Sequence, residues 1–600
     1  MAVVLDAFIS GLVGTLKDMA KEEVDLLLGV PGEIQKLHDI LSNIQSVLHD
    51  AEQRRIEDEA IKYWLTELKN AMYDADDILD ECRTAAEKWT PRESDPRPST
   101  LCGFPFFACF REVNFRHEVG VKIKGLNDRL EEISARRSKL QLHLSAAEPR
   151  VVPRVSRITS PVMESDMVGE RLEEDAKRLV EQMTEQDLSK NVVVLAIVGI
   201  GGIGKTTLAQ KVFNDGKIKA SFRTTIWACV SQEFSGTDLL RNIIEGAGGK
   251  YNREQSRSQL EPTVERLLRG NKFLLVLDDV WDAQIWDDLL RNPLQGGAAG
   301  SRVLVTTRNE GIARQMKAAH GHLMKLLPPE DGWSLMCKKA TMNAEEEGNA
   351  QDLKDTGMKI VEKCGGLPLA IKTIGGVLCT RGLNRNAWEE VLRSAAWSRT
   401  GLPEGVHGAL YLSYQDLPSH LKQCFLYCAL FPEDTEFRGS AIVKLWIAEG
   451  FVEARGDVTL EETGDQYYRE LLHRNLLRSQ PFRPDYKNYS KMHDLLRSLG
   501  HFLSRDESLF ISDVQNEGRS AAVPMKLRRL SIVANETMDI WDIVSSIKQH
   551  ESVRTLLVEG KRGYVKDIDD SSKNLLQLRV LHLMHANIES LPHYIGNLIH

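Results

Sequence analysis

The sequence is poor in the features that mark secreted, membrane-spanning and metal-centred proteins. Nine of its 600 residues are cysteines, and none forms a C-x-x-C pair or another metal-ligand spacing. A disulfide scaffold and a zinc ribbon are therefore excluded. No apolar run approaches the roughly 18 to 20 residues that a spanning helix needs, and residues 1–16 lack the basic start and cleavage site of a secretory signal. We expect a reduced cytosolic or nuclear setting, without constitutive membrane insertion.

A basic excess is missing as well. Lysine and arginine total 77 residues against 86 aspartates and glutamates, which gives a formal net charge of −9. Proteins built for general nucleic-acid binding normally show the opposite balance, so we expect no specific nucleic-acid partner. What the sequence does contain is 42% hydrophobic and 27% charged residues, which is enough for several domains with their own cores.

The strongest local pattern is a phosphate-binding loop. The apolar run 192–198 predicts a strand buried on both faces, and a glycine-rich turn joins it to an amphipathic segment that begins near Lys205. The turn fits G-x-x-x-x-G-K-[ST], in which backbone N–H groups and the start of a helix face phosphates. Lys205 would neutralise the β- and γ-phosphates, and Thr206 would ligate Mg²⁺. A glycine-rich turn with an incidental lysine is the alternative, and the order strand, turn, helix disfavours it. The residues expected to hold the nucleotide are Gly199, Gly201, Gly202, Ile203, Gly204, Lys205, Thr206 and Thr207.

Two later strands are predicted to complete this site. The run 274–277 ends in Asp278 and Asp279, and a carboxylate at such a strand tip can hold Mg²⁺ through water. We assign Asp278 to the metal and Asp279 to polarisation of an attacking water. The strand 302–306 is followed by Arg308, which would sense a γ-phosphate at the same sheet edge; an ordinary surface arginine is the alternative. With a further strand at 225–230, the pattern predicts a parallel sheet covered by helices on both faces.

Residues 1–144 show helical periodicity in four stretches, which predicts a four-helix bundle with coiled-coil-like packing. The stretches are 4–16, 34–48, 61–79 and 126–140. The third carries an acidic cluster that includes Asp76, Asp77 and Asp80. Two interpretations stay open at this point: a solvated helix face, or a docking surface for a basic patch elsewhere in the chain or on a partner.

The second half of the chain is mainly helical. Two glycines and a proline within 364–370 force a turn, and 492–494, Met-His-Asp, opens a further helix in which a lone histidine is more often structural than ligand-binding. From Leu527 a leucine pattern restarts at Val553 and Leu578, 26 and 25 residues on, within the range of leucine-rich repeats. The sequence stops part-way through a repeat, which indicates a piece of a longer array or an unusually short one.

Together these motifs resemble those of the plant intracellular immune receptors of the coiled-coil, NB-ARC, leucine-rich-repeat family, along nearly the whole chain. The matching segments are 199–207, 278–279, 300–308, 366–369, 424–432 and 492–494. The resemblance implies a multidomain α and α/β fold with these parts in order. They are a four-helix bundle of the Rx N-terminal type (1–145), a linker (146–164), a P-loop NTPase parallel α/β domain (165–325), a helical domain (326–405), a winged-helix domain (406–510) and the start of a leucine-rich-repeat solenoid (520–600).

The resemblance also implies roles for single residues. Pro368 would line the adenine or ribose, His493 would reach the β-phosphate, and the backbone near Val168 would meet the base. Asp76, Asp77 and Asp80 resemble the acidic motif on the family's third helix, whose usual partner is an arginine cluster in the repeats. The chain departs from the family where residues 169–171 read Gly-Glu-Arg instead of Gly-Arg-Glu or Gly-Arg-Asp.

The function implied by the resemblance is a switch. The resting state would hold ADP, and perception of a pathogen effector or a guarded host protein would favour ATP with Mg²⁺, then homo-oligomerisation and a defence response or hypersensitive cell death. Domain contacts within the chain would hold the resting state. The expected location is cytoplasmic, with the nucleus or plasma membrane as alternatives on activation. The competing hypotheses are a signalling ATPase or kinase, a helper or regulatory receptor without pore activity, and a DNA reader. We expect at most slow ATP hydrolysis.

Overall fold

The computed structural model describes most of the chain, with gaps. The described residues are 32–45, 47–48, 51, 58–89, 106–140, 170–185, 191–230, 236–252, 255–341, 343–452, 458–479, 489–512, 526–534, 552–560, 575 and 577–584. The predicted first helix, the linker 146–164 and Val168 lie outside these residues. The same holds for the side chain of Asp80, whose backbone is described.

The N-terminal part contains three of the four predicted helices. They are α3 (Glu33–Gln45), α5 (Glu59–Trp89) and α6 (Phe106–Arg136), which continues into η1 (Arg137–Leu140). Their apolar stripes form one buried core. Within it the Trp64 indole donates to the Ile133 carbonyl at 2.7 Å, which ties α5 to α6. The four-helix bundle stays a prediction, because its first helix is outside the described residues.

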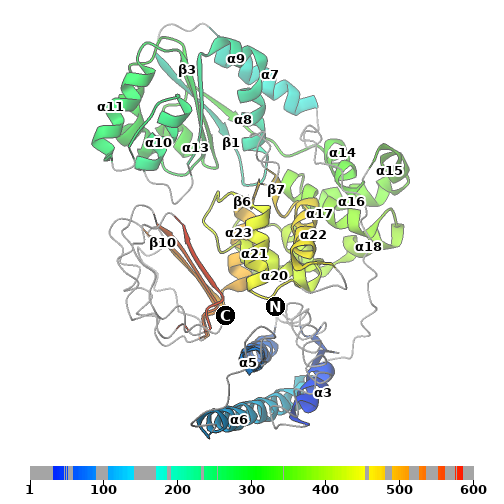
Figure 1. The fold of residues 1–600 in the computed structure, drawn as a ribbon. Coiled ribbons are helices and arrows are strands. Elements are labelled where there is room, and N and C mark those ends of the chain that lie inside the picture. Colours follow the sequence, from blue (N-terminus) through cyan, green and yellow to red (C-terminus); the bar gives the residue numbers. More distant parts are fainter. Residues whose placement is uncertain are drawn as a thin grey trace.

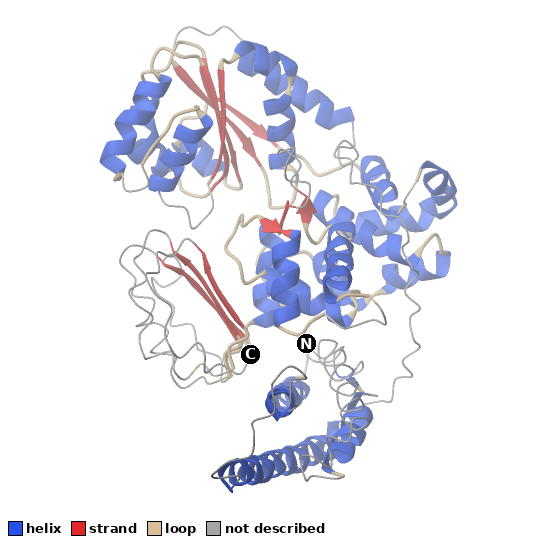
Figure 2. Cartoon of the chain, viewed as in Figure 1, coloured by secondary structure: helices blue, strands red, loops and turns tan. Residues whose placement is uncertain are grey.

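A five-stranded parallel sheet follows, in the order β2-β3-β4-β1-β5. Alternate side chains of its strands belong to two separate cores, so helices cover both faces as predicted (Figure 2). The elements are α7 (Glu170–Thr184), β1 (Val192–Val198), α8 (Lys205–Asn214), α9 (Gly216–Ser221), β2 (Thr224–Cys229), α10 (Gly236–Gly246), α11 (Arg257–Leu268), β3 (Phe273–Val280), η3 (Trp286–Leu290), α12 (Arg291–Leu294), β4 (Ser301–Thr307), α13 (Glu310–Gln315) and β5 (His320–Leu323).

The strand β5 was missed from the sequence. It is short, reads His-Gly-His-Leu, and is mostly exposed at the edge of the sheet beside β1. A strand with this composition shows neither an apolar run nor clear alternation. It nevertheless adds an edge strand to the sheet, beside the strand β1 that leads into the phosphate-binding loop.

Two mainly helical domains complete the centre of the molecule. The first holds α14 (Pro329–Ala340), α15 (Ala344–Asn349), η4 (Ala350–Leu353), α16 (Lys354–Lys363), α17 (Pro368–Arg381), α18 (Arg385–Arg393) and η5 (Ala395–Ser398). The second holds α19 (Gly408–Gln415), α20 (Ser419–Cys428), β6 (Phe437–Arg438), α21 (Gly439–Ala448), α22 (Leu460–His473), β7 (Arg478–Ser479), β8 (Tyr489–Lys491) and α23 (Asp494–Ser504). Its three short strands form an antiparallel sheet, which together with the helices gives the predicted winged-helix domain.

The C-terminal strands form a second parallel sheet, β9 (Ser508–Ser512), β10 (Arg529–Ala534), β11 (Thr555–Gly560) and β12 (Val580–Met584). Leu530 pairs with Leu556, and Leu556 with Leu581. Equivalent positions of the predicted repeats therefore lie side by side. The connections between these strands are outside the described residues, so the repeat solenoid itself stays a prediction.

Figure 1 shows the winged-helix domain at the centre of the molecule. The α/β domain lies above it, the first helical domain to its right, the C-terminal sheet to its left and the N-terminal helices below. Within the described part of the chain, no helix has both the length and the apolarity needed to cross a bilayer.

Candidate nucleotide-binding site

The predicted phosphate-binding loop has the backbone shape that its sequence requires. It leaves the buried strand β1, where the Gly199 N–H donates to the Thr307 carbonyl at 3.2 Å, and enters α8 at Lys205. Gly202 and Gly204 have φ of 75° and 103°, in the left-handed region that favours glycine. The loop therefore curls at the start of a helix, as a phosphate cradle does.

Lys205 is buried without a hydrogen-bonded carboxylate. Its side chain is 7% exposed and its ammonium donates to the Ile200 carbonyl at 3.1 Å. Burial lowers the pKa of Lys205 to about 8, and the cation of Arg308 acts in the same direction, against the attraction of Asp279 and Asp278. A phosphate anion would stabilise this charge, so the loop fits a nucleotide.

Asp278 and Thr206 lie together, as the predicted metal site requires. The Asp278 carboxylate accepts hydrogen bonds from the Thr206 hydroxyl at 3.1 Å and from the Thr306 hydroxyl at 2.6 Å. Burial raises the pKa of Asp278 to about 6, opposed by these hydrogen bonds and reinforced by Asp279. A divalent cation beside the carboxylate would offset that desolvation, so the oxygens present fit Mg²⁺.

Asp279 lies at an irregular position of the strand and has partners different from those of Asp278. Its φ is 59°, and the pairing of β3 with β4 shifts register between Leu277 and Val280. Its carboxylate accepts from the Trp281 indole N–H at 3.0 Å and lies 3.8 Å from the Arg308 guanidinium. Burial raises the pKa of Asp279, while Arg308 and Lys205 oppose the rise.

Arg308 contacts two domains. Its guanidinium lies 4.4 Å from the centre of the Trp281 ring and forms an ion pair with Asp494 at the start of α23. A Cβ at Gly201 would lie 3.0 Å from the same guanidinium, so glycine leaves room for it there. Glu433 joins the group, because carboxylate oxygens of Asp279, Glu433 and Asp494 all lie within 4.8 Å of one another.

The first helical domain also contacts the phosphate-binding loop. Pro368 starts α17, and the next residue, Leu369, donates its N–H to the Gly202 carbonyl at 3.2 Å. A Cβ at Gly202 would lie 2.8 Å from the Leu369 Cβ. Pro368 is thus beside the phosphate-binding loop; its contact with a base or ribose stays a prediction.

His493 reaches the same place from the winged-helix domain. Its Nδ1 accepts the Leu495 N–H at 3.3 Å, which caps α23. Burial lowers the pKa of His493 to about 3, helped by the cations of Arg308, Arg478, Lys205 and Lys372. The imidazole stands among these cations and beside the Asp494 carboxylate, a setting in which a phosphate would find positive charge nearby.

Sequence reasoning missed Trp281, Leu369 and Glu433 as parts of this site. Trp281 directly follows the acidic strand end, and Leu369 follows Pro368, but nothing in either pattern indicates a contact with Arg308 or Gly202. Glu433 lies in a Phe-Pro-Glu-Asp segment far along the chain, and only the folded arrangement brings it near Asp279.

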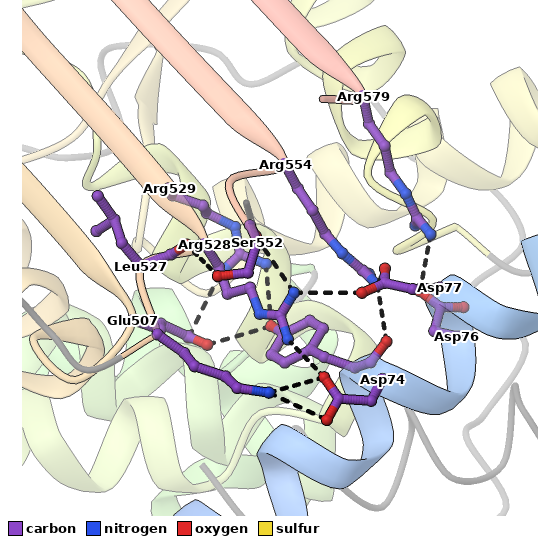
Figure 3. Close-up of polar contacts among 12 residues, drawn as sticks. Asp74, Asp76, Asp77, Glu507, Leu527, Arg528, Arg529, Ser552, Arg554 and Arg579 are labelled. Atoms are coloured by element: carbon purple, nitrogen blue, oxygen red, sulfur yellow. Dashed lines mark hydrogen bonds and ion pairs between the residues drawn. The ribbon is translucent and has the colours of Figure 1, made fainter. Parts of the chain in front are cut away.

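The acidic cluster of the N-terminal helices forms a second site, shown in Figure 3. Asp76 accepts from Arg554 at 2.5 Å and from Arg579 at 2.9 Å, whereas Asp77 pairs with Arg554 and Arg528. We call Arg528, Arg554 and Arg579 the arginine row. Each directly precedes or opens a strand of the C-terminal sheet, at spacings of 26 and 25 residues. An arginine that recurs just before each predicted strand is therefore the sequence signal for this docking surface.

Comparison with known proteins gives three family matches. They are the Rx N-terminal domain over residues 8–117, the NB-ARC domain over 172–346 and the disease resistance protein winged helix domain over 430–499. The chain is similar to disease resistance protein RGA2 of Solanum bulbocastanum, with 33% identity over 99% of the chain and 56% of that protein. It is also similar to putative disease resistance RPP13-like protein 3 of Arabidopsis thaliana, with 30% identity over 96% of the chain and 68% of that protein.

The chain thus spans about half the length of the first of these relatives. Among solved structures, a signal transduction ATPase with numerous domains from Pyrococcus horikoshii aligns at TM-score 0.32 and 18% identity, over 59% of this chain and 45% of that one. The family assignment relies on the sequence matches. On these matches, and with its P-loop nucleotide-binding domain, the chain belongs to the coiled-coil, NB-ARC, leucine-rich-repeat family of plant disease resistance proteins.

Proposed function

We propose that this protein is an intracellular immune receptor switched by ADP and ATP. In the resting state ADP occupies the loop 199–207, with its phosphates near Lys205 and His493. Perception of a pathogen effector, or of a guarded host protein, favours ATP. The protein then assembles with further copies of itself and triggers defence. We propose a cytoplasmic location, with association at the plasma membrane or entry into the nucleus on activation.

The observation that carries this proposal is the sharing of Arg308 between two domains. The guanidinium stands at the end of β4 in the α/β domain, yet it forms an ion pair with Asp494 in the winged-helix domain. A γ-phosphate beside Lys205 would compete for the same cation. Nucleotides that differ by one phosphate would therefore differ in their effect on the contact between these domains.

Repulsion among three carboxylates would add to the effect of this competition for Arg308. Carboxylate oxygens of Asp279, Glu433 and Asp494 lie within 4.8 Å of one another, and Arg308 contacts the first and the last of these residues. If the guanidinium turned to a γ-phosphate, these like charges would repel one another across the domain boundary. ATP would thus weaken the contact between the α/β domain and the winged-helix domain, and ADP would leave this contact intact.

Mg²⁺, when bound with ATP, would neutralise phosphate charge. Thr206 and Asp278 are the residues placed to hold it, and Asp279 is the candidate to orient a water for slow hydrolysis. Because Asp279 accepts from the Trp281 indole and faces Arg308, its position depends on the same cation. We propose that hydrolysis of bound ATP to ADP returns the protein to its resting state. The rate of ATP hydrolysis is expected to be low.

Mass spectrometry of the nucleotide carried by the purified full chain tests the proposal. Wild type is expected to carry ADP, Lys205→Arg is expected to carry little nucleotide, and Asp494→Asn is expected to shift the content towards ATP. Matched controls are Lys211→Arg on the same helix α8 and Glu461→Gln, an exposed carboxylate of the winged-helix domain. Wild-type protein that carries no nucleotide and binds none when ADP is added would refute the switch.

A further inference from the structure

Thr306 lies where the parallel sheet departs from regular pairing. On β3 two residues, Asp278 and Asp279, stand between the paired positions Leu277 and Val280, whereas on β4 only Thr306 stands between the partners of these positions. Two residues of one strand therefore face a single residue of the other. Such a β-bulge bends the strand and redirects the side chains within it. Both acids of the candidate site thus lie in the bulge, opposite Thr306.

The Thr306 hydroxyl contacts both of these acids. It accepts the Asp279 N–H at 2.8 Å and donates to Oδ1 of Asp278 at 2.6 Å. A bulge leaves a backbone group without its regular ladder partner, and here the hydroxyl supplies a partner. Because the Thr306 side chain is 0% exposed, bulk water does not compete for either hydrogen bond.

The bond to the Asp279 N–H stabilises an uncommon backbone conformation. Asp279 has a φ of 59°, which residues other than glycine rarely adopt unless their surroundings hold them there. In this conformation its carboxylate accepts the Trp281 indole N–H at 3.0 Å and lies 3.8 Å from the Arg308 guanidinium. Loss of the Thr306 hydroxyl would remove one of the contacts that hold Asp279 in place.

The bond to Asp278 restricts the rotation of its carboxylate. The same oxygen, Oδ1, also accepts the Thr206 hydroxyl at 3.1 Å. With two donors on one oxygen, the other oxygen is kept in one direction and is left for a water held by Mg²⁺. Carboxylates that hold a metal are commonly oriented by hydrogen bonds of this kind.

Packing of the strand does not account for a hydroxyl at this position. The three residues of β4 before Thr306 are apolar and 0% exposed; they are Val303, Leu304 and Val305. A valine in place of Thr306 would fill nearly the same space and would bury no polar group. The hydroxyl is therefore explained by its two hydrogen bonds to the acids.

We infer that Thr306 is a positioning residue of the nucleotide site, whose hydroxyl orients Asp278 for Mg²⁺ and holds Asp279 in the conformation that faces Arg308. The inference deepens the proposed function and rests on it. Since Arg308 follows two residues later, one strand carries both the hydroxyl that holds Asp279 and the cation that pairs with its carboxylate.

Three variants of the full chain separate this role from packing. Thr306→Val removes the hydroxyl and keeps the shape, and Thr306→Ser keeps the hydroxyl and removes a methyl group. Thr463→Val in α22 is the matched control, because that threonine is 0% exposed and its hydroxyl has no hydrogen-bond partner within the described part of the chain. The first measurement is the Mg²⁺ concentration needed for half-maximal binding of a fluorescent ATP, with ADP binding in the presence of a chelator as the reference.

We expect Thr306→Val to raise the required Mg²⁺ concentration about 10- to 100-fold, as loss of a hydrogen bond to a metal-holding group does. Thr306→Ser should restore most of the affinity, and Thr463→Val should match wild type. Binding of ADP without metal should be the same in all four proteins. An equal Mg²⁺ requirement in Thr306→Val and wild type would overturn the inference, whereas wild type that binds no nucleotide would refute the switch itself.

A second measurement needs neither nucleotide nor metal. Trp281 reports on Asp279 through its indole N–H, and in protein labelled with fluorotryptophan its fluorine NMR signal is identified by its loss in Trp281→Phe. We expect Thr306→Val to shift this signal and Thr306→Ser to leave it near the wild-type position. A role in packing alone predicts the reverse order, since valine fills the space and serine does not; that order, or an unchanged signal in Thr306→Val, would overturn the inference.

Discussion

At the scale of single residues, the site is organised around the Arg308 guanidinium. Trp281 contacts this group through its ring face and holds Asp279 through its N–H. One side chain thus contacts both the cation that pairs with the winged-helix domain and the carboxylate that we propose orients the attacking water. The two contacts can be separated by substitution.

Trp281→Phe keeps an aromatic face under Arg308 and loses the N–H, whereas Trp281→Leu loses both. We expect the phenylalanine variant to hydrolyse ATP several-fold more slowly, because Asp279 is no longer held, with a smaller effect on ADP dissociation. The leucine variant should in addition release ADP a few-fold faster, as a cation–π contact of about 0.5 to 1 kcal/mol is removed. Single-turnover hydrolysis and fluorescent-ADP release measure the two effects. Identical behaviour of the variants would show that stacking has no role.

The sequence predicted the parts of this site that one segment supplies. The loop 199–207 and the acids at 278 and 279 follow from local spacing, since strand, turn and helix are neighbours in the chain. The contacts of Arg308 with Asp494 and of Gly202 with Leu369 join segments more than 160 residues apart, and only tertiary packing brings them together. The edge strand β5 was missed for a different reason, because its composition carries no strand signal.

At the scale of elements, α17 determines how the two helical domains meet. A Cβ at Gly376 would lie 2.6 Å from the Arg474 Cα, and the Asn475 side chain donates to the Lys372 carbonyl at 3.1 Å. Asp416 adds a buried pair, accepting from Arg381 and from Arg474. Backbone thus meets backbone at this helix, with no room for a side chain.

Gly376→Ala should therefore force these domains apart. We expect a loss of about 1 to 3 kcal/mol in the free energy of unfolding, as in other overpacked interiors. Gly348→Ala in α15 is the control, because a Cβ there meets nothing within 4 Å. Denaturant unfolding of both variants measures the difference. Equal stability of the two variants would show that the interface accommodates the added methyl group.

The end of α23 predicts an acid-sensitive contact. Although burial opposes ionisation, Lys69 and Arg529 lower the pKa of Glu507 to about 2, from 4.5. A lowered pKa in the folded state stabilises the protein above pH 4.5, and this stability is lost as pH falls through about 2. The shift corresponds to roughly 3 kcal/mol. Unfolding measured between pH 5 and 2 should show a shallower loss for Glu507→Gln than for wild type.

At the scale of the whole molecule, the arginine row joins the two ends of the described chain. Arg554 pairs with Asp76 and Asp77 and also donates to the Tyr73 carbonyl at 3.2 Å, whereas Arg579 pairs with Asp76 and donates to the Glu449 carbonyl at 3.3 Å. Arg554 thus makes more contacts with α5 than Arg579 does.

Arg554→Ala should accordingly release α5 more than Arg579→Ala does. Removing one partner of a buried ion pair costs about 3 to 5 kcal/mol, and Asp77 would keep only its 3.4 Å contact with Arg528. Hydrogen exchange in α5 of each full-length variant gives the order. A larger effect for Arg579→Ala would contradict the order expected from these contacts.

The position of the arginine row has a consequence for how such receptors diversify. The three arginines directly precede β10, β11 and β12, close after the winged-helix domain, and the match covers 56% of the length of RGA2. Restraint of the N-terminal helices is therefore assigned to the first strands of the array. Under the proposed function, strands further along the array would be free to change with the pathogen, because the contacts that hold α5 lie at β10 to β12.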